Sequence, residues 1–466
     1  MIMIREIALK ELRENFNTVR FYLIFLLTIV LFVVSSIIYV RNHEQKITDY
    51  RNDVSENESL LREKSKDLLQ LARAEQSLLK KPNPLELLSE ANEKILPNKF
   101  QINIFHLEFP EVEGRSNVLL RGFKTVDWEF LIAVVMSFLA FVLSYDAVCG
   151  EKEQKTLSLI FSNSVQSIKV YLGKYFGLLF TLAIPLCFGA VTGLVIISLS
   201  GGISIDYGKV ALFIFVSLLF LSLFLLVGMT VSAIFFQSVT SAVTLLFIWI
   251  IVAFVIPATG NLIATQFHPI PKRGEIEKRI ETTLDDIFDS KYRDSGAGKW
   301  DGNPFASWVP LRAQWSTDIM IARNQIYDDY INQMIQQVEK TKWLTRVSPV
   351  SVFRYLAEEI SGTGVRRFEN FYNQVFLYKQ QLYDFVEDKD RTDDKSPHFL
   401  TLPLTTGSAG ISRLPVEYAS IPQFEERLPH LRDNFGLIIS DLAVLIVLSL
   451  LFFVIGYFLV VRYDKR

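Results

Sequence analysis

A short stretch between two long apolar segments starts as one of the most charged parts of the chain. It covers residues 150–164 and has the sequence GEKEQKTLSLIFSNS. Its first half mixes acidic and basic side chains, and its second half is almost apolar. Side chains of both charges make charge-assisted hydrogen bonds with complementary groups on a partner. The stretch is therefore either a solvated loop or a surface on which another protein docks.

The chain lacks the motifs of the common catalytic and nucleotide-binding sites. It has no G-x-x-x-x-G-K-[ST] phosphate loop, because GKYFG at Gly173 provides only the second half of one. H-E-x-x-H, C-x-x-C and G-x-S-x-G are also absent. We therefore expect no catalytic residue and no cofactor bound by this chain. Energy for any work is expected from another chain or from an ion gradient.

Histidine and cysteine are not spaced as metal ligands, so no metal site is predicted. The five histidines are scattered, at His43, His106, His268, His398 and His430. Both cysteines lie in or beside apolar segments, which leaves no disulfide framework. The formal net charge of −2 argues against a nucleic-acid partner.

The distribution of charge determines the class of protein. The chain has 466 residues and is 50% hydrophobic, which is not unusual for a soluble protein. However, Asp, Glu, Lys and Arg are absent from five long segments, at 21–40, 130–145, 175–205, 210–271 and 442–461. A membrane-spanning helix needs about 20 apolar residues, and the fourth segment is long enough for two. We predict an α-helical integral membrane protein with six transmembrane helices.

Basic residues set the expected orientation in the membrane. They precede the first span, lie between the second and third, and follow the last, at Arg5, Lys10, Arg13, Arg20, Lys152, Lys155, Lys169, Lys174, Arg462, Lys465 and Arg466. Under the positive-inside rule all three flanks lie in the cytoplasm, which requires an even number of spans. We therefore expect a multi-pass protein of the cytoplasmic (inner) membrane with both termini in the cytoplasm.

The segment boundaries follow from these apolar runs. The predicted spans are TM1 at 20–40, TM2 at 128–149, TM3 at 173–199, TM4 at 210–235, TM5 at 239–262 and TM6 at 436–461. Outside them we predict an extracytoplasmic segment at 41–127, a cytoplasmic hairpin at 150–172, a large extracytoplasmic domain at 263–435 and a cytoplasmic tail at 462–466. The two external parts make up about half of the chain and are expected to be mainly helical.

Residues 1–19 are expected to form an amphipathic interface helix on the inner leaflet. Apolar residues recur there at helical spacing, at Ile4, Ile7, Ala8, Leu12 and Phe16. Basic residues between them suit lipid headgroups or a partner protein. A frayed cationic tail is the alternative.

The first span is expected to continue beyond the membrane as a long helix. Apolar residues repeat every seven positions, at Ile47, Val54, Leu61 and Leu68. Pro82 and Pro84 are expected to end this helix, which favours a packed helical hairpin over an extended coiled coil. The sequence FQINIFHLEF that follows alternates like a short strand.

The second external segment has three runs with helical periodicity, at 275–288, 311–343 and 368–386. A turn at SGTG precedes the third run, and residues 396–429 are rich in Pro, Gly and Ser. Asp146 and Asp441 lie near the ends of spans, where structural capping or headgroup contact is expected rather than proton transfer.

The hairpin and the start of the third span carry four short motifs, Glu151-Lys152-Glu153, Thr156-Leu157, Ser162-Asn163-Ser164 and Gly173-Lys174. Together these motifs resemble the coupling region of ABC-2 type permeases. Lys155 stands where that family usually has glycine, so the backbone there is less permissive. The sequence from Val347 to Leu382 is similar to the external domain of one uncharacterised branch with a large insertion between the fifth and sixth spans. IPQF at Ile421 and the terminal VVRYDKR are similar as well.

This resemblance covers nearly the whole chain and implies a function. It implies the permease subunit of an ATP-driven ABC exporter that moves a lipid, a peptide or another amphiphile. Two permease chains would pair, as a homodimer or a heterodimer, and each would receive a separate ABC ATP-binding subunit that holds ATP and Mg²⁺. The expected contacts with that subunit are Glu151, Lys152, Glu153, Lys155, Thr156, Ser164 and Lys169, together with Arg5, Lys10 and Arg13 of the interface helix.

The resemblance also implies that the second and fifth spans line the substrate path. The candidate lining residues are Ser137, Ser144, Thr240, Ser241 and Thr244, although such hydroxyls also bond back to their own helix. A rival hypothesis is a mechanotransmitter, whose external helices act on a periplasmic or surface partner without transport. The long helix after the first span favours this rival. A third hypothesis, a receptor independent of any ATPase, leaves the hairpin unexplained.

Overall fold

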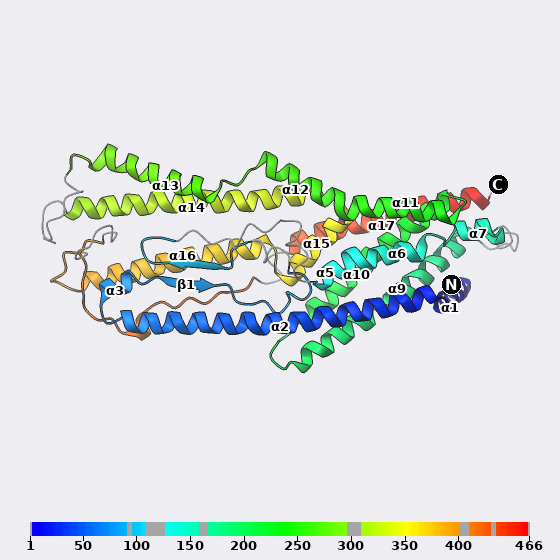
Figure 1. The fold of residues 1–466 in the computed structure, drawn as a ribbon, viewed down its shortest axis with the longest axis horizontal. Helices are drawn as coiled ribbons and strands as arrows, with labels where there is room; N and C mark the ends of the chain where they lie inside the picture. The colour runs from blue at the N-terminus through cyan, green and yellow to red at the C-terminus, as the bar shows by residue number, and fades with distance from the viewer. Residues whose placement is uncertain are drawn as a thin grey trace.

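The protein is an α-helical integral membrane protein, and its described residues include six helices long and apolar enough to cross a bilayer. The computed structural model describes residues 2–90, 96–107, 126–157, 166–295, 309–400, 410–429 and 435–464. Figure 1 shows an elongated molecule in which the spans form a bundle at one end and both termini lie at the tip of that bundle. We call this tip the termini end. The predicted fold class is confirmed.

The spans are preceded by α1 (Ile2–Phe16). They are α2 (Val19–Lys64), the run Trp128–Glu153, α9 (Ser167–Leu199), α10 (Tyr207–Ile234), the run Ser238–Phe267 and α17 (Phe435–Asp464). The second span consists of α5 (Trp128–Phe130), a π-helical turn η2 (Leu131–Met136), α6 (Ser137–Ser144) and α7 (Cys149–Glu153). The fifth consists of α11 (Ser238–Ile250), a second π-helical turn η3 (Ile251–Val255) and α12 (Ile256–Phe267).

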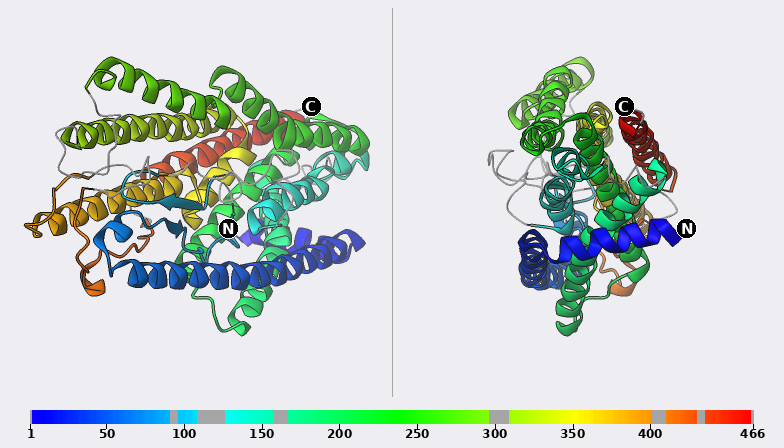
Figure 2. Two further views of the ribbon diagram at one scale, coloured as in Figure 1. Left: turned by 60° about the vertical axis from the view of Figure 1, so that its left-hand side comes forward. Right: turned by 90° about the vertical axis from the view of Figure 1, so that its right-hand side faces the viewer.

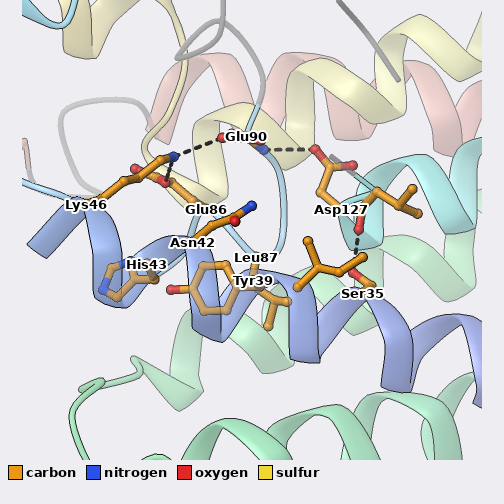
Figure 3. A pocket seen from close by; sticks show the side chains of 11 residues that line it. Ser35, Tyr39, Asn42, His43, Lys46, Glu86, Leu87, Glu90 and Asp127 are labelled. Carbon is orange, nitrogen blue, oxygen red and sulfur yellow. Dashed lines mark hydrogen bonds and ion pairs between the residues drawn. The ribbon is translucent and has the colours of Figure 1, made fainter. Parts of the chain in front are cut away.

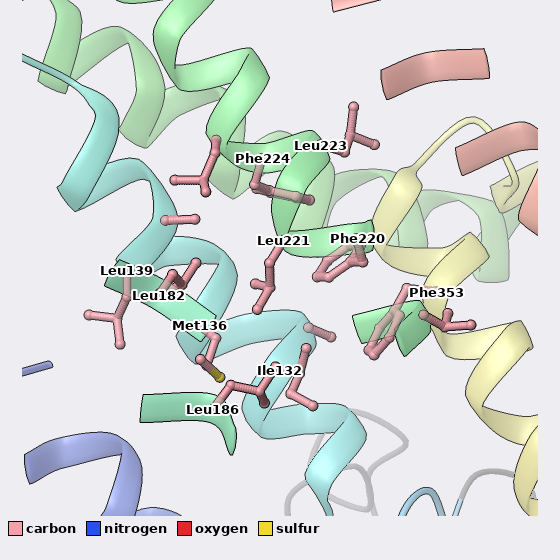
Figure 4. Close-up of a cluster of buried hydrophobic side chains, with 14 of the residues drawn as sticks. Ile132, Met136, Leu139, Leu182, Leu186, Phe220, Leu221, Leu223, Phe224 and Phe353 are labelled. Carbon is pink, nitrogen blue, oxygen red and sulfur yellow. The ribbon is translucent and has the colours of Figure 1, made fainter. Parts of the chain in front are cut away.

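Helix α10 forms the centre of the bundle. It is apolar on all sides, which is typical of a helix enclosed by others. Phe220 and Leu221 are fully buried, and the ring of Phe224 lies 4.8 Å from that of Phe220. Figure 4 shows these side chains packed against Met136 of η2 and Leu186 of α9. Because lipid is as apolar as these side chains, close van der Waals packing holds the spans together.

The part of the chain beyond the other end of the bundle is called the polar domain here, and comprises the described residues of 41–107 and 268–429. Its helices include α3 (Leu68–Ala72), α13 (Arg273–Ile287), η4 (Phe288–Tyr292), α14 (Val309–Thr345), α15 (Pro349–Ser361), α16 (Val365–Arg391) and η5 (Tyr418–Ser420). The strands β1 (Gln76–Leu79) and β2 (Lys99–Ile102) pair antiparallel, with Gln76 opposite Ile102. The three predicted helical runs correspond to α13, α14 and α16.

The first span continues into the polar domain as predicted, but its end was predicted wrongly. Helix α2 stops at Lys64 rather than at the prolines, because Ser65 caps it and the chain turns. The side chain of Asp67 then accepts a hydrogen bond from the backbone N–H of Leu69 at 2.9 Å and starts α3. Within the described part of the chain, the outer half of α2 packs mainly against β1 rather than along a second long helix. The predicted helical hairpin is therefore wrong.

Helix α15 was not predicted, although both of its ends carry recognisable signals. Ser348 caps its start and Pro349 occupies its first turn. Gly362 ends it in the left-handed conformation, at φ +72°, which a residue with a side chain adopts only at a cost. Ser-Pro before an apolar run and Gly after it would have been enough to place this helix.

Candidate functional site

The termini end of the bundle brings together three elements that are far apart in sequence. Lys174 at the start of α9 places its Nζ 2.7 Å from a carboxylate oxygen of Glu11 in α1 and 2.7 Å from one of Glu151 in α7. Its side chain is only 6% exposed. Figure 2 shows α1 crossing the bundle at this end. One buried cation therefore links the interface helix, the hairpin and the third span. We call Glu11, Glu151 and Lys174 the charge cluster.

Two glycines let α1 lie directly on α9. A Cβ atom at Gly173 would lie 2.6 Å from the Cβ of Ile7, and one at Gly177 would lie 2.5 Å from the Cβ of Glu11. These separations are too short for any side chain. The two glycines are four residues apart on one face of the helix, which is the G-x-x-x-G pattern of close helix packing in membranes. GKYFG is thus a helix-packing motif, and the sequence analysis missed it.

The exposed face of α1 carries the basic residues expected there. Arg5, Lys10 and Arg13 are exposed, while Ile7 and Glu11 face α9. Lys10 forms an exposed ion pair with Glu14 at 3.5 Å. The exposed face therefore carries three basic residues together with Glu6 and Glu14, and the packed face is occupied by α9.

Helix α7 is fastened to the fourth and fifth spans. The ammonium of Lys152 donates a hydrogen bond to the carbonyl oxygen of Ala233 at the end of α10. The carboxylate of Glu153 accepts from the hydroxyl of Ser238 at 2.8 Å and from its backbone N–H at 3.3 Å, at the start of α11. The hydroxyl of Ser232 accepts from the backbone N–H of Cys149 at 3.0 Å. A displacement of α7 therefore moves three other spans.

The remaining predicted coupling residues lie around the tip of the hairpin. Lys155 is exposed and adopts the left-handed conformation, at φ +59°. The hydroxyl of Thr156 donates to the carbonyl oxygen of Glu151 at 3.3 Å. Lys169 is partly buried in the first turn of α9, and Ser164 lies outside the described residues. A left-handed residue at 155 agrees with the glycine that the resemblance expects there.

Replacing Lys155 with glycine should stabilise the protein by about 1 kcal/mol, because a side chain strains a left-handed backbone and glycine does not. The midpoint of thermal unfolding in detergent should rise accordingly. Lys155→Ala is the matched control, because it removes the same charge but keeps a Cβ atom. A lower midpoint for the glycine variant than for the alanine variant would contradict this interpretation.

The two residues of the second span that were predicted to line a substrate path form hydrogen bonds within that span. Ser137 donates to the carbonyl oxygen of Ala133 at 2.6 Å, and Ser144 donates to that of Ala140 at 2.7 Å. Ser137 also accepts a hydrogen bond from the indole N–H of Trp249 at 3.1 Å. This last bond joins the second and fifth spans next to their π-helical turns, which occur frequently at functional sites.

The residues of the fifth span that were predicted to line a substrate path include both exposed and buried side chains. Thr244 donates to the carbonyl oxygen of Thr240 at 2.8 Å, and Thr240 is exposed. Ser241 is buried, and its hydroxyl has no hydrogen-bond partner within the described residues. The assignment of a path to these residues stays a prediction.

The two acidic residues at the span ends form ion pairs. Asp146 accepts from Arg20 at 2.8 Å, which joins the second span to the start of α2. Asp441 near the outer part of α17 accepts from Arg346 at 2.8 Å. Both contacts are structural, in line with the expected capping role.

Helix α15 lies among the spans at the end of the bundle that joins the polar domain. Phe353 and Leu356 are fully buried, and the ring of Phe353 stacks on that of Phe220 in α10 at 4.4 Å. Arg354 lies 2.7 Å from Glu129 of α5. The polar domain is therefore connected to the second, fourth and sixth spans by packed side chains and ion pairs.

A small polar pocket lies where α2 leaves the bundle (Figure 3). Lys46 lies 2.7 Å from Glu86 and 2.9 Å from Glu90, and the backbone N–H of Glu90 donates to Asp127 at 3.0 Å. The cavity volume is about 30 Å³, which is room for one water molecule. These contacts hold the segment around residue 86 on α2, and the space is too small for a substrate. No group of three or more potential metal ligands occurs among the described residues.

Among the described residues, six spans, a packed interface helix and a hairpin fastened to the third, fourth and fifth spans define a polytopic membrane protein. The family model described as ABC-2 family transporter protein matches residues 5–466, and the chain belongs to this family. It is therefore a multi-pass ABC permease subunit, of a kind that is generally not catalytic and that works with an ABC ATP-binding partner. No curated protein matches the chain significantly.

Proposed function

We propose that this chain is the membrane subunit of an ATP-driven exporter whose ATP-binding subunit docks on α1 and α7. The charge cluster is the observation that carries the proposal. It ties both docking elements to the third span through one buried lysine. Removing one partner of a buried ion pair costs about 3–5 kcal/mol, so the three elements move as one body. ATP and Mg²⁺ belong to the partner subunit, and the termini end faces the cytoplasm.

The exposed charges on these elements provide the docking surface. Arg5, Lys10 and Arg13 line the free face of α1, and Lys155 is exposed at the tip of the hairpin. These basic groups suit acidic side chains on the ATP-binding subunit. The acidic and basic side chains of α7 itself contribute indirectly to docking. Glu151, Lys152 and Glu153 hold α7 to the bundle. Closure of the ATP-binding subunits would shift α7 and, with it, the spans.

The fifth span offers a wide apolar face for a second permease chain or for lipid. Val239, Phe247 and Leu262 are all more than half exposed. Large exposed apolar surfaces mark protein or membrane contacts. A permease dimer, of two identical or two related chains, would cover part of this face. A substrate that enters from such a surface is an amphiphile, such as a lipid or a peptide.

A mechanotransmitter is the second candidate, and α15 is the observation that favours it. This helix is buried among the spans and belongs to the polar domain, and ion pairs from Arg354 and Arg346 tie the two parts together. A shift of the spans would therefore move the polar domain, including the long α2. In this case the polar domain acts on a periplasmic or surface partner.

Purification from native membranes tests the proposed function. The tagged chain is expected to carry an ABC ATP-binding subunit and magnesium-dependent ATP hydrolysis with it. Proteoliposomes of this complex then separate the two candidates. An exporter moves a fluorescent lipid or peptide across the bilayer when ATP is added, whereas a mechanotransmitter hydrolyses ATP and moves neither. Purification without any ATP-binding subunit would contradict both.

A further inference from the structure

An open groove lies in the polar domain between the outer half of α2 and the segment 418–425. Its floor is β1 and one side chain of α16, and its volume is about 550 Å³. Pockets of this size hold small organic ligands and short peptide segments. Its walls come from four separate parts of the chain, so the groove exists only in the folded domain. It is distant from the charge cluster.

The groove is lined by aromatic rings. Tyr50 of α2, Tyr378 of α16, Tyr418 and Phe424 all border it, and the rings of Tyr378 and Phe424 lie 5.5 Å apart. Val54, one of the residues in the seven-residue repeat, opens into it and is 38% exposed. Aromatic side chains bury a large apolar area and keep a polar edge for hydrogen bonds. Of the repeat positions, Val54 is therefore exposed to the groove, whereas Leu61 and Leu68 are buried.

The floor of the groove holds polar groups without partners. Gln76 is 1% exposed, and the hydroxyl of Tyr378 donates to its Oε1 at 2.7 Å, so its Nε2 is the remaining donor. This nitrogen and the hydroxyl of the neighbouring Ser77 have no hydrogen-bond partner in the described part of the chain. An unpaired buried donor costs about 1–3 kcal/mol, which a ligand oxygen would recover.

The rim of the groove is acidic. Glu58 and Glu425 are exposed, and neither forms an ion pair within the described residues. Asp53 is paired with Lys99 at 3.1 Å. Arg51 is the single basic side chain among the described residues that line the groove. An ammonium or guanidinium group therefore fits this rim better than an anion does.

The outer edge of β1 already pairs with an amide group. The side chain of Asn57 donates to the carbonyl oxygen of Ser77 and accepts from its N–H at 3.0 Å. A neighbouring peptide strand makes the same pair of hydrogen bonds. The edge of β1 at Ser77 is therefore already occupied, and the groove offers a ligand the free donor of Gln76, the aromatic walls and the acidic rim. Peptides with basic side chains satisfy all three, because their carbonyl oxygens accept from that donor, whereas an amine without a carbonyl oxygen satisfies only the last two.

We propose that this groove binds a short extended peptide segment that carries a basic side chain. A carbonyl oxygen of the peptide accepts from Gln76, apolar side chains pack on Val54 and the tyrosines, and the cationic group pairs with Glu58 or Glu425. The proposal does not depend on ATP or on the direction of transport. It holds for the exporter and for the mechanotransmitter alike.

Fluorescence anisotropy with the full chain in nanodiscs tests this site without any ATP-binding subunit. The probe is a labelled short peptide of alanine, leucine and lysine, and the comparison is the same peptide with glutamate for lysine. We expect saturable binding of the basic peptide only. Glu58→Gln and Glu425→Gln should each weaken it about threefold. Val54→Trp should abolish it by filling the groove.

Glu56→Gln is the matched control, because Glu56 is exposed on the same helix and does not line the groove. The Glu56→Gln variant should bind the basic peptide with the same affinity as the unchanged chain. The absence of saturable binding, equal binding of the acidic peptide, or unchanged binding by Val54→Trp would each overturn the proposal. Thermal unfolding is measured for every variant, and the glutamine substitutions, at exposed positions, should leave the midpoint unchanged.

Discussion

Lys174→Met is expected to destabilise the protein by about 3–5 kcal/mol and to uncouple ATP hydrolysis from the spans. The change removes the one cation between Glu11 and Glu151, whose side chains are only 15% and 20% exposed. Two buried carboxylates are then left to repel each other without compensation. Thermal unfolding in detergent measures the first effect, and the ATPase activity of the complex in the presence of substrate measures the second.

Two further variants test whether the effect of Lys174→Met comes from the charge cluster or from the loss of any lysine. Lys10→Met removes an ion pair whose side chains are 63% and 59% exposed, and should cost less than about 1 kcal/mol. Adding Glu11→Gln and Glu151→Gln to Lys174→Met should recover most of the stability, since the charge cluster then holds no unpaired charge. An unchanged unfolding midpoint for Lys174→Met would contradict the role of the cluster.

Gly177→Leu is expected to lift α1 from α9 and to reduce binding of the ATP-binding subunit. Any Cβ atom at this position would lie 2.5 Å from the Cβ of Glu11. Overpacking of this kind costs about 1–3 kcal/mol, although leucine is a better helix former than glycine. Trypsin should then cleave within α1, for example at Arg13, faster than in the unchanged chain. The amount of co-purified ATP-binding subunit should fall in parallel.

Gly436→Leu is the matched control for this change. A Cβ atom at Gly436 meets no other atom within 4 Å, so leucine there should leave both measurements unchanged. Equal effects at the two positions would show that the loss comes from the helix or the membrane and not from the contact with α1. Slower cleavage in Gly177→Leu would contradict close packing of the two helices.

The spans and the position of the hairpin could be predicted because they depend on local features. An apolar run of sufficient length defines a span wherever it occurs. The left-handed residue at 155 also has a local signal, since the family resemblance expected glycine there. The end of α2 was predicted wrongly because a local signal elsewhere was stronger than the signal at its true end. Ser65 and Asp67 are ordinary capping residues, and the prolines further on were a stronger but irrelevant signal.

The roles of the hairpin charges could not be predicted, because they depend on contacts between distant segments. Glu151 was expected on a docking surface, and Lys174 was expected among the basic residues between the second and third spans, yet both are largely buried beside Glu11. That burial follows from the packing of α1 on α9, which the two glycines allow. Reading GKYFG as a helix-packing motif would have placed α1 correctly. Burial of α15 among the spans likewise depends on Phe220 and its neighbours and has no local signal.

Photo-crosslinking from position 155 tests most directly whether an ATP-binding subunit docks on α1 and α7. A photoreactive amino acid replaces Lys155, which is exposed at the tip of the hairpin, and the control replaces Lys278, which is exposed on α13 in the polar domain. Light should join position 155, and not position 278, to an ABC ATP-binding subunit in native membranes. No such product from position 155, or equal products from both positions, would contradict the proposed docking.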